Sequence, residues 1–428
     1  MIRYVSGSTA LVLFCVFPCP SVTKPVAKKL LIRLCHYSCY SSFKFNAWFK
    51  AMSAANINPQ MLTWARKRLG LSVSEFAKKL AQKEDKLVAW EEEEAKPTFK
   101  QAINFAKKAH IPFAYLFLPE PPVEQPLLAD LRTVGSQQLG RYSVELNDTI
   151  KLMQGRQFWY REFLLAEGAS KLDFVGSFQN NLDVNALVKA IRNKLALNTL
   201  TRKGDWEDYY RTLVEKIEAL GVLVMRQGFL GHPTRPLRVE EFRGFALVDD
   251  YAPLIFINHA DAPGPRLFTL MHELAHLWIG VSGVSDLNTS AEKESEQFCN
   301  AVAAELLVPE VEFKKSWVAD LDDWQEQLAG LAAQFYVSQW VIARRALTFG
   351  YITARAYQQF INAENKAFQK REKQSRGSSY YVTKQSQVSK NFTQALVNDA
   401  LNGNTPLREV ANLMQMKPAN LSKLVKEL

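Results

Sequence analysis

The sequence predicts an α+β fold that is mainly helical, with a helix-turn-helix domain before a small mixed core and a helical C-terminal region. Most of the chain places apolar residues at helical spacing, whereas three short stretches have the pattern of strands. Two further helices, at about 265–279 and 290–307, follow these strands and complete the core. The predicted strands are 221–225, 242–248 and 254–258.

The composition is that of a globular protein of two to four domains. The 428 residues are 47% hydrophobic and 22% charged, which excludes collagen, a long disordered chain and a low-complexity scaffold. The net charge of +10 is uneven, because residues 1–51 and 365–428 contribute +7 each and residues 52–364 carry −4. The basic ends therefore do not indicate that the whole protein binds nucleic acid.

The first 51 residues differ from the rest of the chain. They contain no Asp or Glu, and their apolar stretch 9–17 is too short to span a bilayer. We expect residues 1–51 to be a non-native or disordered extension with the true start at Met52; an export signal or a zinc site at its two cysteine pairs are the alternatives. Because no other run is long enough to span a membrane and Cys299 is the one cysteine of the body, we expect a cytoplasmic protein without membrane association. The four cysteines of the extension are Cys15, Cys19, Cys35 and Cys39.

Short helices joined by tight turns predict a helix-turn-helix domain over 58–118. Ser72 and Glu75 have the spacing of a capping box, and Thr98 precedes the fourth helix. The third helix, about 83–94, should enter the major groove of DNA in this architecture, but its side chains sum to −4. Sequence-specific DNA binding, binding only as a homodimer and a protein-docking role all remain open for this domain. Arg66, Lys67 and Arg68 suit either contacts to phosphates or a solvated helix face.

Prolines and helical segments organise the chain on either side of the predicted strands. A stiff Pro-rich linker covers 119–135, and an amphipathic helix follows at about 137–167. Residues 311–364 form a helical element, and 365–390 form a basic linker. The tail 391–428 resembles a second small helix-turn-helix, with a solvated dimerising cap as the alternative.

Two histidines and a glutamate lie together in His272-Glu273-Leu274-Ala275-His276. On a helix, positions 272 and 276 are one turn apart, so both imidazoles can bind one tetrahedral zinc at about 2.0–2.1 Å. Glu273 lies beside that face and can act as general base toward a zinc-activated water that attacks a peptide carbonyl. The alternative is a buried amphipathic helix that matches the motif by chance.

A third protein ligand is expected, because catalytic zinc sites usually take three and leave one position for water. Glu296 on the next helix can ligate the metal, and Asn300, one turn later, can hydrogen-bond a ligand. Glu292 shares that face, so spacing alone leaves a choice, whereas Glu294 suits the helix dipole. Cys299 lies three residues beyond Glu296 and is the residue that could close a purely structural site.

These motifs resemble the ImmA/IrrE family of metallo-endopeptidases, and within it the subgroup with a fused XRE-type helix-turn-helix. The resemblance implies a minimal gluzincin fold, with a small sheet packed on two zinc-bearing helices. Carried over by position, it implies His272, His276 and Glu296 as zinc ligands and Glu273 as the base. Val302 and Cys299 depart from the residues that are common in the family. The stretches that carry the resemblance are 64–71, 117–122, 243–247, 255–258, 269–276 and 296–309.

The resemblance implies a metallopeptidase domain over 136–310 and a regulatory protein as its substrate, such as a repressor or an antitoxin-like partner. The alternative function is a non-catalytic transcriptional regulator or antitoxin whose zinc core is structural or vestigial. We expect strand 254–258 to be an edge strand that holds the substrate by β-augmentation. His259 and His232 are candidates for stabilising the oxyanion, although each suits an ordinary loop position better.

Overall fold

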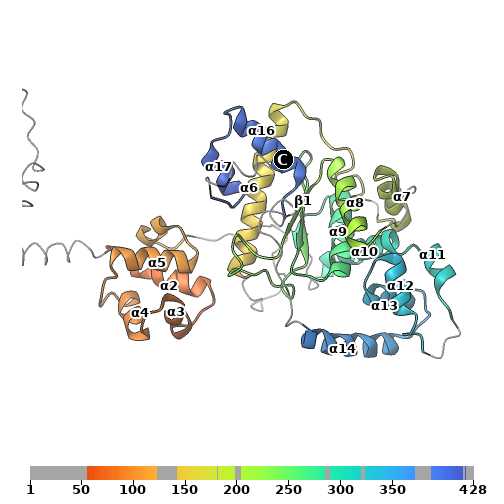
Figure 1. Cartoon of the computed structure of the whole chain (residues 1–428), viewed down its shortest axis with the longest axis horizontal. Helices are drawn as coiled ribbons and strands as arrows, with labels where there is room; N and C mark the ends of the chain where they lie inside the picture. The colour runs from red at the N-terminus through yellow and green to blue at the C-terminus, as the bar shows by residue number, and fades with distance from the viewer. Residues whose placement is uncertain are drawn as a thin grey trace, which may run out of the picture. The chain divides into compact units, whose positions relative to one another are not determined.

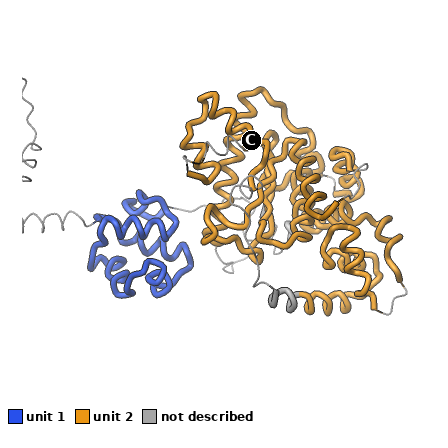
Figure 2. Tube along the Cα trace, in the orientation of Figure 1, with its two compact units in different colours: residues 1–123 blue, residues 124–428 orange. Residues whose placement is uncertain are grey.

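A computed structural model gives the fold in two compact units, Met1–Val123 and Glu124–Leu428 (Figure 2). The extension 1–51 and most of the two predicted linkers lie outside the residues that the structure describes. None of the helices in the described part of the chain is both long and apolar enough to cross a membrane. The described residues are 55–122, 142–180, 182–197, 204–284, 290–319, 323–371, 387–417 and 420.

The first unit is a bundle of short helices around one apolar core. The capping box is confirmed, because Glu75 N–H donates to Ser72 Oγ at 3.3 Å and Ser72 N–H donates to Glu75 Oε2 at 2.8 Å. Thr98 and Gln101 cap the fourth helix in the same way. The order of helices agrees with the predicted domain, and its identity as a helix-turn-helix stays a prediction. The helices are α2 (Pro59–Arg68), α3 (Val73–Leu80), α4 (Glu84–Glu91), α5 (Phe99–Ala109) and the 3₁₀ helix η1 (Phe113–Phe117).

The acidic third helix is shorter than predicted. It ends at Glu91 rather than at residue 94, because Glu93 adopts a left-handed conformation with φ 65°. Glu91 pairs with Arg66, whose guanidinium donates two hydrogen bonds of 2.7–2.8 Å to the carboxylate. Arg66 is only 9% exposed, so the solvated or phosphate-facing role considered for it is wrong.

The second unit is built on a sheet of four strands in the order β1-β3-β2-β4. Strand β3 pairs in parallel with β1 and antiparallel with β2, which in turn pairs with β4. The predicted strands are present, but the expectation that 254–258 is an edge strand is wrong. The chain inserts β3 between β1 and β2, so both of its edges are hydrogen-bonded and all five residues are buried. The strands are β1 (Leu223–Gln227), β2 (Gly244–Leu247), β3 (Leu254–Asn258) and β4 (Gly283–Val284).

Both faces of the sheet are buried, and strand residues alternate between two separate cores. Ile255 and Ile257 of β3 point into one core, whereas Leu254 and Phe256 point into the other. Burial on both faces explains why the strands are continuously apolar in the sequence. Figure 1 shows the helices on either side of the sheet.

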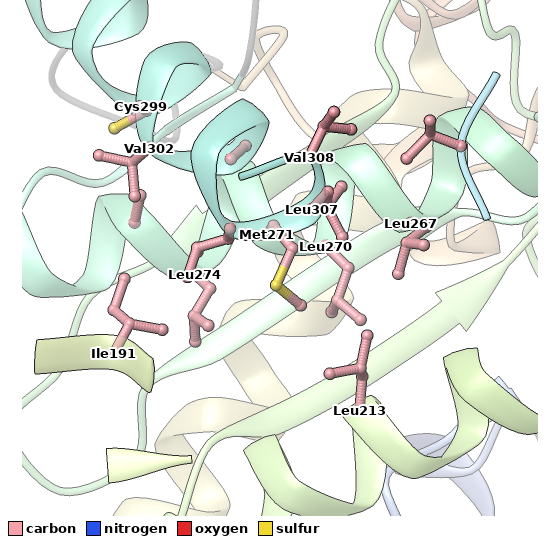
Figure 3. Packing of buried hydrophobic residues seen from close by; sticks show 14 of the residues in the cluster. Ile191, Leu213, Leu267, Leu270, Met271, Leu274, Cys299, Val302, Leu307 and Val308 are labelled. Atoms are coloured by element: carbon pink, nitrogen blue, oxygen red, sulfur yellow. The ribbon is translucent and has the colours of Figure 1, made fainter. Parts of the chain in front are cut away.

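The first core lies between the sheet and a group of helices that includes α9 and α10. Figure 3 shows Leu270 and Leu274 of α9 among the apolar side chains of α10, such as Val302. The predicted helical element 311–364 continues this side of the unit, since Phe335 and Ile342 belong to the same core. The helices that contribute to this core are α7 (Val184–Lys194), α8 (Trp206–Ala219), α9 (Pro263–Ile279), α10 (Ser290–Leu307), α11 (Glu310–Ser316), α12 (Leu328–Phe335), α13 (Gln339–Thr348) and α14 (Ala354–Arg371).

The second core joins the predicted tail to the sheet. Helix α16 (Lys390–Leu401) contributes Phe392 and Leu396, both 0% exposed, and α17 (Leu407–Leu413) also packs on α6 (Val144–Ala166). The tail is thus part of the second unit in the structure. Arg156 of α6 bridges this junction, because its fully buried Nε donates to Leu413 O at 2.9 Å.

Replacing Phe392 with Ala tests whether the tail is integral to the second unit. We expect Phe392→Ala to lower the free energy of unfolding by about 3–5 kcal/mol, because a fully buried aromatic ring leaves a cavity. The matched control, Leu401→Ala on the same helix, removes a side chain that is 68% exposed and should have little effect. Urea denaturation followed by circular dichroism measures both. Equal midpoints for the two variants would contradict an integral tail.

Candidate metal centre

Helix α9 carries both motif histidines into the interior. Pro263 and Pro265 stand in its first turn, where a missing N–H costs nothing, and Gly280 ends it in the left-handed conformation at φ 72°. His272 and His276 are 4% and 3% exposed on one face of this helix. The predicted helix is confirmed, and it begins two residues earlier than expected.

The three predicted ligand side chains converge on one point. The Nε2 atoms of His272 and His276 lie 3.0 Å apart, and each lies 3.1 Å from a different carboxylate oxygen of Glu296. Ligands about 2.0–2.1 Å from a tetrahedral metal lie roughly 3.3 Å from one another. The triad therefore has nearly the dimensions of three corners of such a tetrahedron. Among the described residues, this triad is the one group of His, Cys, Asp or Glu side chains whose ligand atoms lie close enough together to hold a metal ion.

The electrostatics of Glu296 favour the ionised ligand form. Burial alone would raise the pKa of this carboxyl, but hydrogen bonds from His272 and His276, and then their charge, lower the pKa to about 2. The carboxylate is thus ionised at neutral pH, as a ligand of a divalent metal must be. Nitrogen and oxygen donors of this kind suit zinc.

Glu273 lies against the sheet next to the ligand pair, and it is fully buried. Gly244 of β2 makes this position possible. A Cβ at residue 244 would lie 2.5 Å from Thr269 Cγ2, 2.8 Å from Phe256 O and 3.1 Å from Glu273 Oε1. A glycine is therefore required where α9 crosses β2, because any larger residue would displace the helix or the carboxylate.

Glu294 and Cys299, the other candidates on α10 whose side chains are described, do not belong to the candidate metal group. Glu294 is exposed, as a residue in the first turns of a solvated helix should be, and the side chain of Glu292 lies outside the described residues. Cys299 is fully buried in the apolar core, and burial raises the pKa of its thiol (Figure 3). It does not belong to the candidate metal group, so the closed structural site that we considered for it is not formed. Asn300 lines the same cavity as His272 and Glu296, where it can reach a ligand or substrate.

Neither histidine considered for the oxyanion lines that cavity. His259 Nε2 lies 3.1 Å from Arg266 Nη1, and burial followed by the charge of Arg266 lowers the pKa of His259 to about 4. His232 lines a separate pocket together with residues of α17 and of the segment that follows it. The sequence could not exclude them, because both are close to the motif strands in the chain but are directed elsewhere by the loops that carry them.

An open cavity of about 180 Å³ gives access to the triad. Its wall includes residues that the sequence analysis did not assign to the site, above all Arg243 and Phe268. No local spacing links Arg243 to the motif, because it lies 29 residues before His272 and is brought there by the turn into β2. The lining residues are Val239, Glu240, Glu241, Phe242, Arg243, Phe268, Thr269, His272, Glu296 and Asn300.

Comparison with known proteins supports the resemblance drawn from the motifs. Residues 217–347, which include the sheet, α9 and α10, match the Peptidase_M78 family, described as the IrrE N-terminal-like domain. Residues 388–427 match DUF8813, a domain of unknown function. A search of curated proteins finds no match. The first match supports the ImmA/IrrE family and a metallopeptidase-type fold for this part of the chain. It does not reach the first unit.

Metal analysis of the purified full chain tests the triad. We expect about one divalent ion per chain. His276→Ala and Glu296→Gln should each lose most of the metal, whereas the matched control His232→Ala should retain it. Wild-type metal content in His276→Ala would contradict the assignment.

Substituting Gly244 tests the close approach of α9 to β2. Gly244→Ala should lower the free energy of unfolding by about 1–3 kcal/mol, because the added methyl group overpacks against Thr269 and a backbone carbonyl. Gly155→Ala is the control: this helical glycine has open space around it, and the change should stabilise the protein by about 0.5–1 kcal/mol. Thermal or urea unfolding distinguishes the two. A neutral Gly244→Ala would show that the contact is not tight.

Proposed function

We propose that the second unit is a zinc-dependent endopeptidase. The observation that carries this proposal is the convergence of His272 Nε2, His276 Nε2 and both Glu296 oxygens at the wall of an open cavity. Three protein ligands with access to solvent are typical of catalytic zinc, whereas structural sites usually have four. When bound there, zinc would activate a water molecule and polarise the peptide carbonyl.

The residues of the chain supply the remaining chemistry. Glu273 directly follows the ligand His272 in the chain, and its carboxylate is shielded from bulk solvent. It would take the proton of the attacking water and deliver it to the nitrogen of the leaving group. Asn300 would hydrogen-bond the substrate or a ligand from the cavity wall.

The substrate would bind as an extended segment along the outer edge of β2. On that side β2 pairs with β4 only at Phe245 and Ala246, so Gly244 has no strand partner there among the described residues. A Cβ at Gly244 would lie 3.1 Å from Glu273 Oε1, which places this part of β2 next to the reacting groups. Backbone hydrogen bonds to β2 would hold a peptide by β-augmentation, the role first expected of β3.

We propose a regulatory protein, such as a repressor or an antitoxin-like partner, as the substrate class. The first unit would bind a protein rather than the phosphates of DNA. The exposed side chains of α4 and the following turn include Glu84, Asp85 and residues 92–94, which would repel phosphates. Phe99 and Phe117 are 52% and 48% exposed, and apolar groups of this size suit a protein surface.

Glu273→Gln tests the catalytic proposal. The variant should retain one zinc per chain and lose at least 100-fold in cleavage rate, because general-base catalysis typically contributes about 10²–10⁴-fold. Cleavage of the proteins encoded beside the gene, co-expressed and separated on gels, is the measurement. Equal cleavage by wild type and variant, or none by zinc-loaded wild type, would leave the non-catalytic regulator as the better account.

A further inference from the structure

Arg243 occupies the wall of the metal cavity without a role in the chemistry described so far. It directly precedes β2, and it lines the cavity together with His272, Glu296 and Asn300. Its side chain is 48% exposed, so part of the guanidinium is open to solvent. The inference drawn from it rests on the proposed function and concerns which peptides the site accepts.

The backbone at Arg243 is fixed by one buried side chain and its main chain. Asn258, at the end of β3, is 0% exposed. Its backbone N–H donates to Arg243 O at 2.8 Å, and its Nδ2 donates to Phe242 O at 3.1 Å. Two consecutive carbonyls are thus held by the same residue, and the start of β2 has a defined position beside the cavity.

The guanidinium is fixed as well. Arg243 Nη1 donates to Asp261 Oδ2 at 2.6 Å, and Asp261 is only 4% exposed. Asp261 is itself held, because its other oxygen accepts from Ala262 N–H at 2.8 Å and its carbonyl accepts from Arg266 Nε at 2.6 Å. One anchored hydrogen bond leaves the other N–H groups of Arg243 without a hydrogen-bond partner among the described residues. A preorganised arginine of this kind binds carboxylates without a large loss of side-chain entropy.

The glutamates that line the cavity form no ion pair with this arginine, which is paired with Asp261. Glu241 accepts hydrogen bonds of 2.6 Å from both Ser143 N–H and Ser143 Oγ, so its carboxylate is held by the residue that caps α6. Glu296 faces the two histidines, and Glu240 is exposed. Arg243 is the one Lys or Arg side chain that lines the cavity within the described part of the chain. With a divalent ion at the triad, the formal charges of the ion, Arg243 and the three lining glutamates sum to zero, so a substrate carboxylate would be bound by the local geometry of Arg243 and not by a net positive cavity.

We infer that Arg243 is a specificity-determining residue that binds a carboxylate of the peptide substrate beside the bond to be cleaved. The carboxylate can come from an Asp or Glu side chain or from a free C-terminus, since both present the same two oxygens to the guanidinium. Asp261 is the positioning residue that holds Arg243 for this contact. Lysine at 243 would keep the charge but lose the planar geometry.

Peptide binding to the zinc-loaded full chain carrying Glu273→Gln tests this inference without requiring turnover. Fluorescent peptide mixtures would be compared by anisotropy in four forms, with internal Glu or Gln and with a free or amidated C-terminus. We expect at least tenfold tighter binding of one carboxylate-bearing form over its amide counterpart. The pair that shows the difference identifies the source of the carboxylate.

Variants at three positions separate recognition from folding. Adding Arg243→Ala should abolish the preference, Arg243→Lys should retain part of it, and Asp261→Asn should weaken it. The control Arg238→Ala removes an exposed charge from the same loop and should keep the full preference. Circular dichroism checks that each variant is folded, and Arg243→Lys remains informative if Arg243→Ala does not fold.

Equal binding of all four peptide forms, or a preference unchanged in the Arg243 variants, would overturn the inference. Failure of the proposed function would instead appear as absence of cleavage by the zinc-loaded wild type.

Discussion

The packing of α9 between the sheet and α10 is the constraint on which the site depends. The helix is buried almost throughout, and its apolar residues enter the first core while His272 and His276 face Glu296. The surrounding core fixes both imidazole rings, so that each Nε2 lies 3.1 Å from an oxygen of the same carboxylate. Gly244 sets how closely the helix approaches β2, so one missing side chain on the strand determines where Glu273 lies.

The second core supports the same cavity from the opposite face of the sheet. Helix α6 is capped at its start by Ser143, whose partner Glu241 lines the cavity. Further along, α6 holds the tail through the buried Arg156 and the ring of Phe392. The cavity rim and the tail are thus attached to one helix. The tail therefore covers one face of the sheet and supports the cavity rim through α6, although the metal site lies on the other face of the sheet.

Local patterns in the sequence predicted what local physics determines. The capping boxes, the apolar strands and the one-turn spacing of His272 and His276 depend on neighbours within a few residues. The order of the strands does not depend on near neighbours. Strand β3 is central because the chain crosses over between β1 and β3, and no local pattern predicts such a crossover. The Arg66–Glu91 pair and the Arg243–Asp261 pair join residues 25 and 18 positions apart, so charge counts along the chain misassigned the first and missed the second.

Zinc K-edge X-ray absorption on the purified full chain tests the central claim most directly, because it reports the atoms around the metal. The account predicts four nitrogen or oxygen neighbours at about 2.0–2.1 Å, with imidazole scattering from two histidines and no sulfur. A zinc–sulfur distance of about 2.3 Å would contradict it. Such a distance would place the Cys299 thiol on the metal and make the centre a closed structural site.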